Sequence, residues 1–228
     1  MSVSIKEVVS RKDLKNFVQF GTDLYHDSPY FCPPLFFDEI NTLDKKKNSA
    51  FEVCEAIYYL AYKNNKIVGR IAGIVNHRAN EAWGVKKTRF GWFDFIDDTD
   101  VSFSLLKAVE NWGKAKGMDS INGPVGFTDF DHEGLLIEGF DQLGTLATIY
   151  NYPYYAKHYE AYGLTKDIDS LEWKIYTPKE VPVRMARISA LVKEKYNLRY
   201  VKVKSHKELV KRFGYTFFDL IDEAYRPL

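Results

Sequence analysis

The densest group of side chains with acid–base chemistry lies in one short stretch. Its charged members are Asp129, Asp131, His132 and Glu133. A histidine beside carboxylates can bind an amine or accept its proton, so the stretch predicts a substrate-binding patch. The spacing begins like a calcium loop, but Glu138 falls two residues short of the bidentate ligand position, so no metal is expected. A solvated loop is the alternative interpretation.

Another carboxylate lies within an aromatic run, residues 90–96, that predicts a strand. Asp94 alternates along this run with Trp92 and Ile96. A carboxylate held between aromatic rings can take a proton from an ammonium group, so Asp94 is a predicted general base. A salt bridge at the end of the strand is the alternative. On the next predicted strand, Asn122 offers an amide that orients backbone groups, and we assign it to the substrate side.

The turn that follows the aromatic strand is acidic, reading Asp97, Asp98, Thr99 and Asp100. A strand, turn and helix in this order usually hold a ligand, often a phosphate, at the N-terminus of the helix. This turn has three carboxylates and no glycine. Asp98, Thr99 or Asp100 can cap the helix and so occupy the N–H donors that a phosphate needs. The order of elements therefore suggests a phosphate-bearing cofactor, whereas the turn argues against the usual way of holding one.

Tyrosines are concentrated in one segment. Six of the sixteen fall between residues 150 and 162, within a chain that is 16% aromatic. Such density predicts a wall of rings with polar tips, suited to a pocket or to an interface, and Tyr155 is assigned to the substrate side. Core packing with hydroxyls that reach solvent is the alternative.

Hydrophobic periodicity predicts a mixed sheet with helices between its strands. The predicted strands are 5–9, 56–62, 67–75, 90–96, 120–124 and 171–176. Predicted helices run over 10–24 and 101–116, with a third that ends at Gly163. Asn64 and Asn65 suit a tight hairpin turn, 77–88 reads as a polar loop, and three prolines make 27–34 irregular.

The last fifty residues read like a second beginning. A strand-like run, a Ser, a basic pair, an acid and a Leu occur in 201–209, as they do in 7–14. The end of the chain, 224–228, similarly echoes 30–35. We therefore expect a domain over 1–176 and a C-terminal extension over 177–228 that opens a duplicated unit. An accessory extension of a single domain is the alternative.

Bulk composition excludes several classes of protein. The net charge is +1, so no global field attracts nucleic acid or an anionic membrane. No apolar stretch reaches the ~20 residues that span a bilayer, and no signal-peptide core begins the sequence. Cys32 and Cys54 have neither metal-binding nor redox spacing. These features predict a cytoplasmic protein in a reducing compartment.

The order of predicted elements resembles the GNAT superfamily of N-acetyltransferases. The hairpin over 56–75, the unit over 90–124 and the ending Tyr159 to Leu164 carry the resemblance. That ending is similar to the family's "Tyr, three residues, Gly-Phe" signature, with Leu164 in place of Phe. A bacterial variant with segments like 123–127 and 138–141 is more similar still. The resemblance implies an α/β (α+β) fold, a GNAT-like mixed central sheet with flanking helices and a partial or accessory C-terminal unit.

The resemblance also implies a function and its residues. It implies N-acyl transfer from acetyl-CoA, another acyl-CoA or a similar thioester to a small-molecule amine. Tyr159 matches the position of a general acid that protonates the departing thiolate, while Asp94 or the 129–133 stretch deprotonates the amine. The family holds the CoA pyrophosphate where this chain has the backbone of Asp98, Thr99, Asp100 and Val101, but the Arg/Gln-x-x-Gly-x-Gly/Ala motif is missing.

Two rival interpretations and one question stay open. The first rival is a non-catalytic GNAT-like module that binds a ligand or a protein, and an open cleft between the parallel strands would argue against it. Filling of that cleft by Trp92, Phe93 and Tyr155 would favour it. The second rival places cofactor binding in the duplicated unit. A homodimer also stays open.

Overall fold

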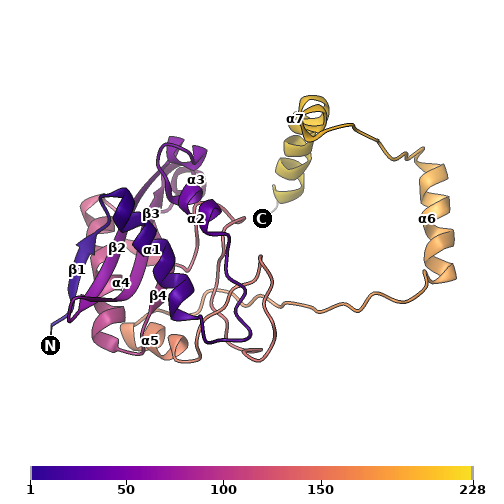
Figure 1. The fold of residues 1–228 in the computed structure, drawn as a ribbon. Coiled ribbons are helices and arrows are strands. Elements are labelled where there is room, and N and C mark those ends of the chain that lie inside the picture. The colour runs from indigo at the N-terminus through magenta and orange to yellow at the C-terminus, as the bar shows by residue number, and fades with distance from the viewer. Residues whose placement is uncertain (1, 227–228) are drawn as a thin grey trace. The chain divides into compact units, whose positions relative to one another are not determined.

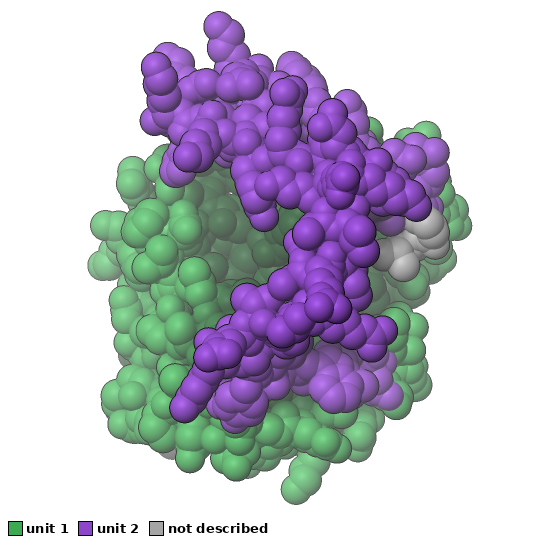
Figure 2. Space-filling view, turned by 90° about the vertical axis from the view of Figure 1, so that its right-hand side faces the viewer, with its two compact units in different colours: residues 1–168 green, residues 169–228 purple. Residues whose placement is uncertain are grey.

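The computed structural model describes residues 2–226, and it divides into two units, Met1–Ile168 and Asp169–Leu228 (Figure 1). Figure 2 colours these two units separately. The sequence places its boundary at residue 176, and the division by contacts falls between Ile168 and Asp169. Each unit is described by itself below.

Unit 1 contains a five-stranded mixed sheet. In spatial order its strands are β1 (Ser4–Glu7), β2 (Cys54–Lys63), β3 (Lys66–Asn76), β4 (Lys87–Phe95) and β5 (Ser120–Asn122). The first three pairings are antiparallel, and β4 pairs with β5 in parallel. The antiparallel beginning and the parallel crossover confirm the GNAT-like mixed sheet.

Helices cover both faces of this sheet. One face carries α1 (Arg11–Leu24) and α2 (Phe36–Leu43), and the other carries α4 (Thr99–Ala115) and α5 (Tyr155–Tyr162). Successive strand residues point to opposite faces, so Leu60 packs with the α1 side and Ala61 with the α4 side. The two resulting cores hold the sheet rigid beneath the site described below.

Local sequence signals place several turns correctly. Asn64 and Asn65 both have positive φ, of 54° and 60°, as the hairpin between β2 and β3 requires. Gly163 ends α5 with a φ of 97°. In β4, Trp92 has a φ of 44°, and the register between β3 and β4 shifts opposite this residue. This bulge bends the part of β4 that leads to the acidic turn.

Three predictions of local structure were wrong. The predicted polar loop contains α3 (His77–Trp83), because Asn76 caps its first turn by accepting from Ala79 N. The predicted strand 171–176 is irregular, and its alternating Leu171, Trp173 and Ile175 are 77–86% exposed. The strand-like run at 201–203 is irregular as well. A strand needs a neighbour for its backbone hydrogen bonds, and none pairs with either segment among the described residues.

Unit 2 has helices but no core of its own. It contains α6 (Val183–Lys195) and α7 (His206–Tyr225), joined by irregular chain. None of its described residues is buried. Across residues 2–226, no helix is both long and apolar enough to cross a membrane.

A close approach between α4 and β4 gives a test of this packing. A Cβ added at Gly113 would lie 2.0 Å from Thr88 Oγ1 and 3.0 Å from Thr88 Cβ, and the Thr88 side chain is fully buried. We expect Gly113→Ala to lose stability toward the upper end of the ~1–3 kcal/mol typical of overpacking. That loss exceeds the ~1 kcal/mol by which Ala favours a helix over Gly. Urea unfolding followed by tryptophan fluorescence measures it.

Gly214→Ala is the matched control, because a Cβ there meets only Val210 Cγ1, at 3.5 Å. This variant is expected to keep or raise the helicity of α7 in circular dichroism and to leave the unfolding of unit 1 unchanged. Equal stability of Gly113→Ala and the unmodified chain would contradict the packing of α4 on β4.

Candidate functional site

The two parallel strands separate soon after they pair. Their ladder ends at Arg89 and Asn122, with one further bond of 2.8 Å from Val125 N to Phe90 O. Strand β4 continues to Phe95 with β3 still paired along one edge, but among the described residues no strand lies along its other edge beyond Arg89. We call the region between residues 90–95 of β4 and the chain that leaves β5 the splay. Helix α5 covers it.

Tyrosine hydroxyls take over the backbone hydrogen bonds that β5 does not make. Phe95 N donates to the Tyr155 hydroxyl at 3.2 Å, and the Tyr154 hydroxyl donates to Phe95 O at 2.5 Å. The rings of Phe95 and Tyr155 stack with centroids 4.3 Å apart. An unpaired buried backbone group is costly, so these hydroxyls allow β4 to end at the splay without a partner strand.

A buried ion pair lies beneath the tyrosines. Arg70 Nε donates to Asp94 Oδ2 at 2.7 Å, and the Tyr25 hydroxyl donates to Asp94 Oδ1 at 2.7 Å. The hydroxyls of Tyr25 and Tyr155 lie 2.6 Å apart. Burial, and then the charge of Asp94, raise the pKa of Tyr25 and of Tyr155 well above the usual range. Both phenols therefore stay protonated, as donors to this network.

The geometry bears on the predicted role of Asp94. Both of its oxygens already accept hydrogen bonds within the protein, and Arg70 Nη1 also donates to Phe17 O in α1 at 2.9 Å. The carboxylate thus joins β4, β3 and α1. A substrate amine would have to displace one of these donors to reach it.

The Tyr159 hydroxyl has a different environment. It is buried, and it has no hydrogen-bond partner among the described residues. Its ring lies against Phe90 and Phe93, with centroids 5.8 and 5.5 Å away. Burial, followed by the negative charge of Asp94, raises the pKa of Tyr159 well above the usual range. A protonated phenol with a free O–H therefore lies at the splay.

Asn122 shares this property at the end of β5. Its Oδ1 is buried and has no partner within residues 2–226. A Cβ added at the next residue, Gly123, would lie 3.0 Å from the ring of Phe90, the same ring that contacts Tyr159. Tyr159 and Asn122, which the sequence assigns to catalysis and substrate binding, thus each leave a buried oxygen unpaired among the described residues.

The acidic turn uses its carboxylates within the protein. Asp98 caps α4, accepting from Asp100 N at 3.0 Å through Oδ1 and from Lys63 Nζ at 2.5 Å through Oδ2. Its backbone carbonyl accepts from Val101 N at 3.1 Å, and Thr99 O accepts from Ser102 Oγ at 3.2 Å. The helix N-terminus is therefore occupied by a carboxylate, and this donor set does not fit a pyrophosphate.

One residue of this region was missed by the sequence interpretation. His158 is buried, with Nδ1 2.8 Å from Ser102 Oγ and Nε2 2.8 Å from Asp97 Oδ1. These contacts have the connectivity of a Ser-His-Asp triad, but the Ser102 side chain is fully buried, so the arrangement ties α5 to the start of α4. His158 lies three residues after Tyr155 on one helix, a spacing that places both on the covered face.

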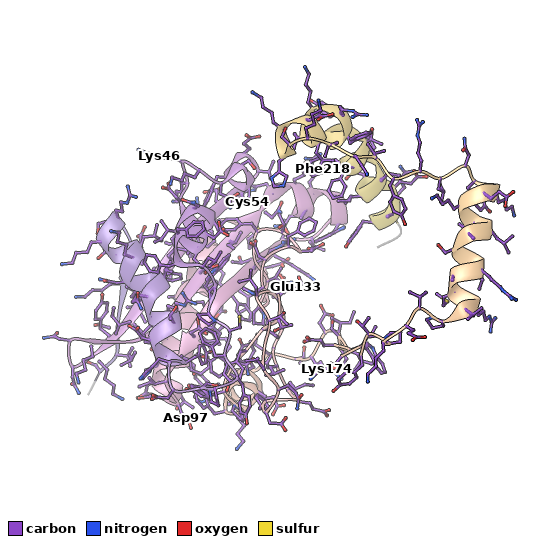
Figure 3. The ribbon with its side chains drawn as sticks, turned by 45° about the vertical axis from the view of Figure 1, so that its right-hand side comes forward. Lys46, Cys54, Asp97, Glu133, Lys174 and Phe218 are labelled. Atoms are coloured by element: carbon purple, nitrogen blue, oxygen red, sulfur yellow. The ribbon has the colours of Figure 1, made fainter. Side chains whose placement is uncertain are left out.

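The 129–133 stretch does not gather into one cluster. Asp131 Oδ2 accepts from Phe127 N at 2.7 Å and from Thr128 N at 3.1 Å, and His132 Nε2 lies 2.8 Å from Leu146 O. Partial burial raises the pKa of Asp131 and of Glu133. Asp129 and Glu133 are exposed, and Figure 3 shows Glu133 in a different part of unit 1 from Asp97. Among the described residues, no group of His, Cys, Asp and Glu side chains is arranged to hold a metal.

Unit 1 has a cavity whose lining includes none of residues 90–95 of β4. Its volume is about 450 Å³, and its lining includes Ser120 and Ile121 of β5, Lys114 near the C-terminal end of α4, and Tyr162. Glu110, which also lines it, accepts from Lys114, Lys107 and Tyr162, and these donors lower its pKa to about 2. None of the side chains predicted to act in catalysis lines this cavity.

Comparisons with known proteins give two curated relatives. Over 169 residues the chain is 35% identical to Protein YghO of Escherichia coli K12, covering 74% of this chain and 43% of the relative. Over 181 residues it is 26% identical to the bacterial ceramide synthase of Caulobacter vibrioides, covering 79% and 47%. The chain thus spans about half the length of each.

Solved structures give a more distant likeness, and no protein-family model matches the chain. A predicted acetyltransferase from Clostridium acetobutylicum, solved with acetyl-CoA, is 12% identical with a TM-score of 0.47. The match covers 75% of this chain and 96% of that structure.

Two variants distinguish the two roles of Asp98, as the acceptor that caps α4 and as the ion-pair partner of Lys63. Asp98→Ala removes the acceptor of Asp100 N and should cost about 1 kcal/mol. Asp98→Asn keeps an oxygen acceptor and loses only the ion pair with Lys63, so it should be the more stable of the two at pH 7. Thermal unfolding compares them, and equal stabilities would contradict a capping role.

The same pair predicts a pH dependence with a defined sign. The hydrogen bond from Lys63 lowers the pKa of Asp98. Ionised Asp98 therefore stabilises the fold above the unfolded-state pKa of about 3.9, and this contribution is lost as the pH falls through the lower folded-state value. In Asp98→Asn the free energy of unfolding should therefore fall less between neutral and acidic pH than it does in the unmodified chain. Thermal unfolding over this pH range measures the difference.

The buried ion pair gives a larger effect. Arg70→Met leaves the Asp94 carboxylate buried without its cation, and we expect a loss of about 3–5 kcal/mol in the free energy of unfolding. The double variant Arg70→Met/Asp94→Leu should recover much of that loss, because no charge is then left buried. Arg212→Met, which breaks an exposed i,i+4 pair with Glu208, is the control and should change nothing measurable.

Proposed function

We propose that unit 1 transfers an acyl group from a thioester to the nitrogen of a small-molecule amine. In the reaction the amine nitrogen forms a bond to the carbonyl carbon, the carbon–sulfur bond breaks, and the amine proton passes to a base. The thiolate receives a proton from an acid. Everything that follows assigns groups of this chain to those tasks.

The observation that carries the proposal is the unpaired hydroxyl of Tyr159. A buried hydroxyl without a partner costs about 1–3 kcal/mol, a cost that a partner supplied by the substrate would offset. Its raised pKa keeps the phenol protonated at neutral pH, as an acid acting on a thiolate must be. The GNAT-like position of Tyr159 assigns it the same task. The unpaired Asn122 Oδ1 is a second point at which substrate can bind.

The base is proposed from the 129–133 stretch in preference to Asp94. Asp94 is held by Arg70 and Tyr25, so we propose that it positions α1, β3 and β4 around the splay. Gly134 N donates to Pro124 O at 2.8 Å, which ties this stretch to the chain that leaves β5, and burial followed by the charge of Asp129 raises the pKa of the exposed Glu133 carboxylate.

The donor is proposed to be a thioester that is not held by a pyrophosphate at α4. Asp98 occupies that helix N-terminus, and an added diphosphate would approach the three carboxylates of the turn. A CoA thioester can still react, but its diphosphate should contribute little to binding.

The acceptor class is proposed from the Caulobacter relative, a ceramide synthase. A ceramide is an N-acylated long-chain amino alcohol, so its synthesis forms the amide bond proposed here. We therefore propose a long-chain amino alcohol as the acceptor to test first.

Amide formation from two donors tests this function. Acyl-CoA and the S-acyl-N-acetylcysteamine of the same acyl chain share the thioester, but only acyl-CoA carries a diphosphate. With sphinganine as acceptor, we expect turnover with both and KM values within about tenfold, or 1.4 kcal/mol. No amide from either donor would overturn the proposal, and turnover with acyl-CoA alone would refute the donor assignment.

Tyr159→Phe tests the proposed acid. We expect kcat to fall by about 10²-fold or more with little change in KM. Because the substitution removes an unpaired buried hydroxyl, the melting temperature should hold or rise, which separates lost chemistry from lost folding. Tyr162→Phe is the matched control on the same helix, since its hydroxyl donates to Glu110 at 2.9 Å and should not affect kcat.

A non-catalytic binding module is the second candidate, and one observation favours it. Phe93 and Tyr155 are buried at the splay, whereas Trp92 donates to Glu39 of α2 at 2.6 Å. Phe93 and Tyr155 are thus packed at the splay, as the binding module requires, whereas Trp92 is not. Ligand-induced thermal stabilisation without any amide product would select this candidate.

A further inference from the structure

We infer that residues 199–226, although 199–204 are irregular here, correspond to the first strand and helix of a second GNAT-like unit. The apolar face of α7 is then a docking surface for an antiparallel sheet like β2–β3, supplied by polypeptide that follows Leu228 in the complete gene product. This inference does not rest on the proposed acyl transfer. It begins from a comparison of α7 with α1.

The two helices start with the same device. Ser10 caps α1, with its Oγ accepting from Asp13 N at 3.1 Å, and Ser205 caps α7, with its Oγ accepting from Glu208 N at 3.2 Å. In each case the acid also accepts from the backbone just before the helix. Asp13 accepts from Ser10 N at 3.0 Å, and Glu208 accepts from Lys204 N at 2.9 Å. The sequence echo is thus matched by an equivalent local structure.

The two helices differ in what covers them. In α1, Phe17 is fully buried and its ring lies 5.5 Å from that of Tyr58 in β2. Helix α7 has an apolar stripe of its own at helical spacing. The stripe consists of Leu209, Val210, Phe213, Phe217, Leu220, Ile221 and Ala224. In this stripe Val210 is 67% and Phe217 59% exposed, and nothing in the described part of unit 2 is buried.

Unit 2 by itself leaves this apolar stripe uncovered. Soluble proteins rarely expose contiguous apolar patches of more than a few hundred Å². In unit 1 the partner of the equivalent helix is the antiparallel sheet, preceded by a strand at 4–7. Residues 199–204 hold the corresponding place before α7, and they lack a strand to pair with among the described residues. If α7 is equivalent to α1, the surface that packs on its apolar stripe is the apolar face of a β-sheet.

The two curated relatives are longer than the stretch that matches this chain. The aligned stretches account for 43% and 47% of the two curated relatives, so more than half of each lies outside the match. A second unit of the size of unit 1 fits within that remainder. A second copy of this chain is the competing occupant, and the experiment distinguishes the two.

The experiment compares the complete gene product with the 228-residue chain. Sequencing past the codon for Leu228 should show an open reading frame, and in the complete product the amides of α7 should exchange with solvent at least about tenfold more slowly. In that product Phe217→Asp should abolish the protection. Tyr215→Asp, which changes a side chain outside the stripe that is 90% exposed, should retain it.

Three results would overturn the inference. One is a stop codon directly after Leu228. Another is equally fast exchange of α7 in both proteins, a comparison that needs no variant. The third is dimerisation of the 228-residue chain in sedimentation, with protection of α7 that rises with concentration, because the occupant is then a second copy.

Discussion

The parting of two parallel strands is the constraint on which the rest of unit 1 depends. Once β5 leaves β4, the last residues of β4 lose a partner for their backbone groups. The chain meets this cost with side chains, since the hydroxyls of Tyr154 and Tyr155 bond Phe95 O and N. The buried ion pair of Arg70 and Asp94 then joins β3 and β4 to α1 beneath these tyrosines. The tyrosine-rich segment is thus explained by the geometry of a sheet edge.

Three buried side-chain oxygens have no partner among the described residues. They are Thr88 Oγ1, where α4 packs on β4, Asn122 Oδ1 at the end of β5, and the Tyr159 hydroxyl against Phe90. Most buried polar groups in proteins are satisfied, so such exceptions have diagnostic value. The proposed ligand at the splay rests on two of them, the oxygens of Tyr159 and Asn122.

The acidic turn argues against a pyrophosphate at the N-terminus of α4, but it leaves acyl transfer from a thioester open. A carboxylate caps α4, while Lys63 and His158 pair with the other oxygens of the turn. The start of α4 is therefore stabilised internally, with no need for a bound anion. In unit 2, by contrast, a helix with a comparable cap has an apolar stripe and nothing buried. Figure 3 shows the side chain of Phe218 on α7.

Local signals in the sequence determined most strands and helices of unit 1, the hairpin at Asn64 and Asn65, and the caps at Ser10 and Ser205. They did so because periodicity, positive φ and capping each act within a few residues. Only the tertiary structure decided that Asp94 is tied to Arg70 and Tyr25, that His158 meets Ser102 and Asp97, and that 171–176 forms no strand. These outcomes depend on partners distant in sequence, and a strand or a buried charge is stable only where such a partner is brought to it.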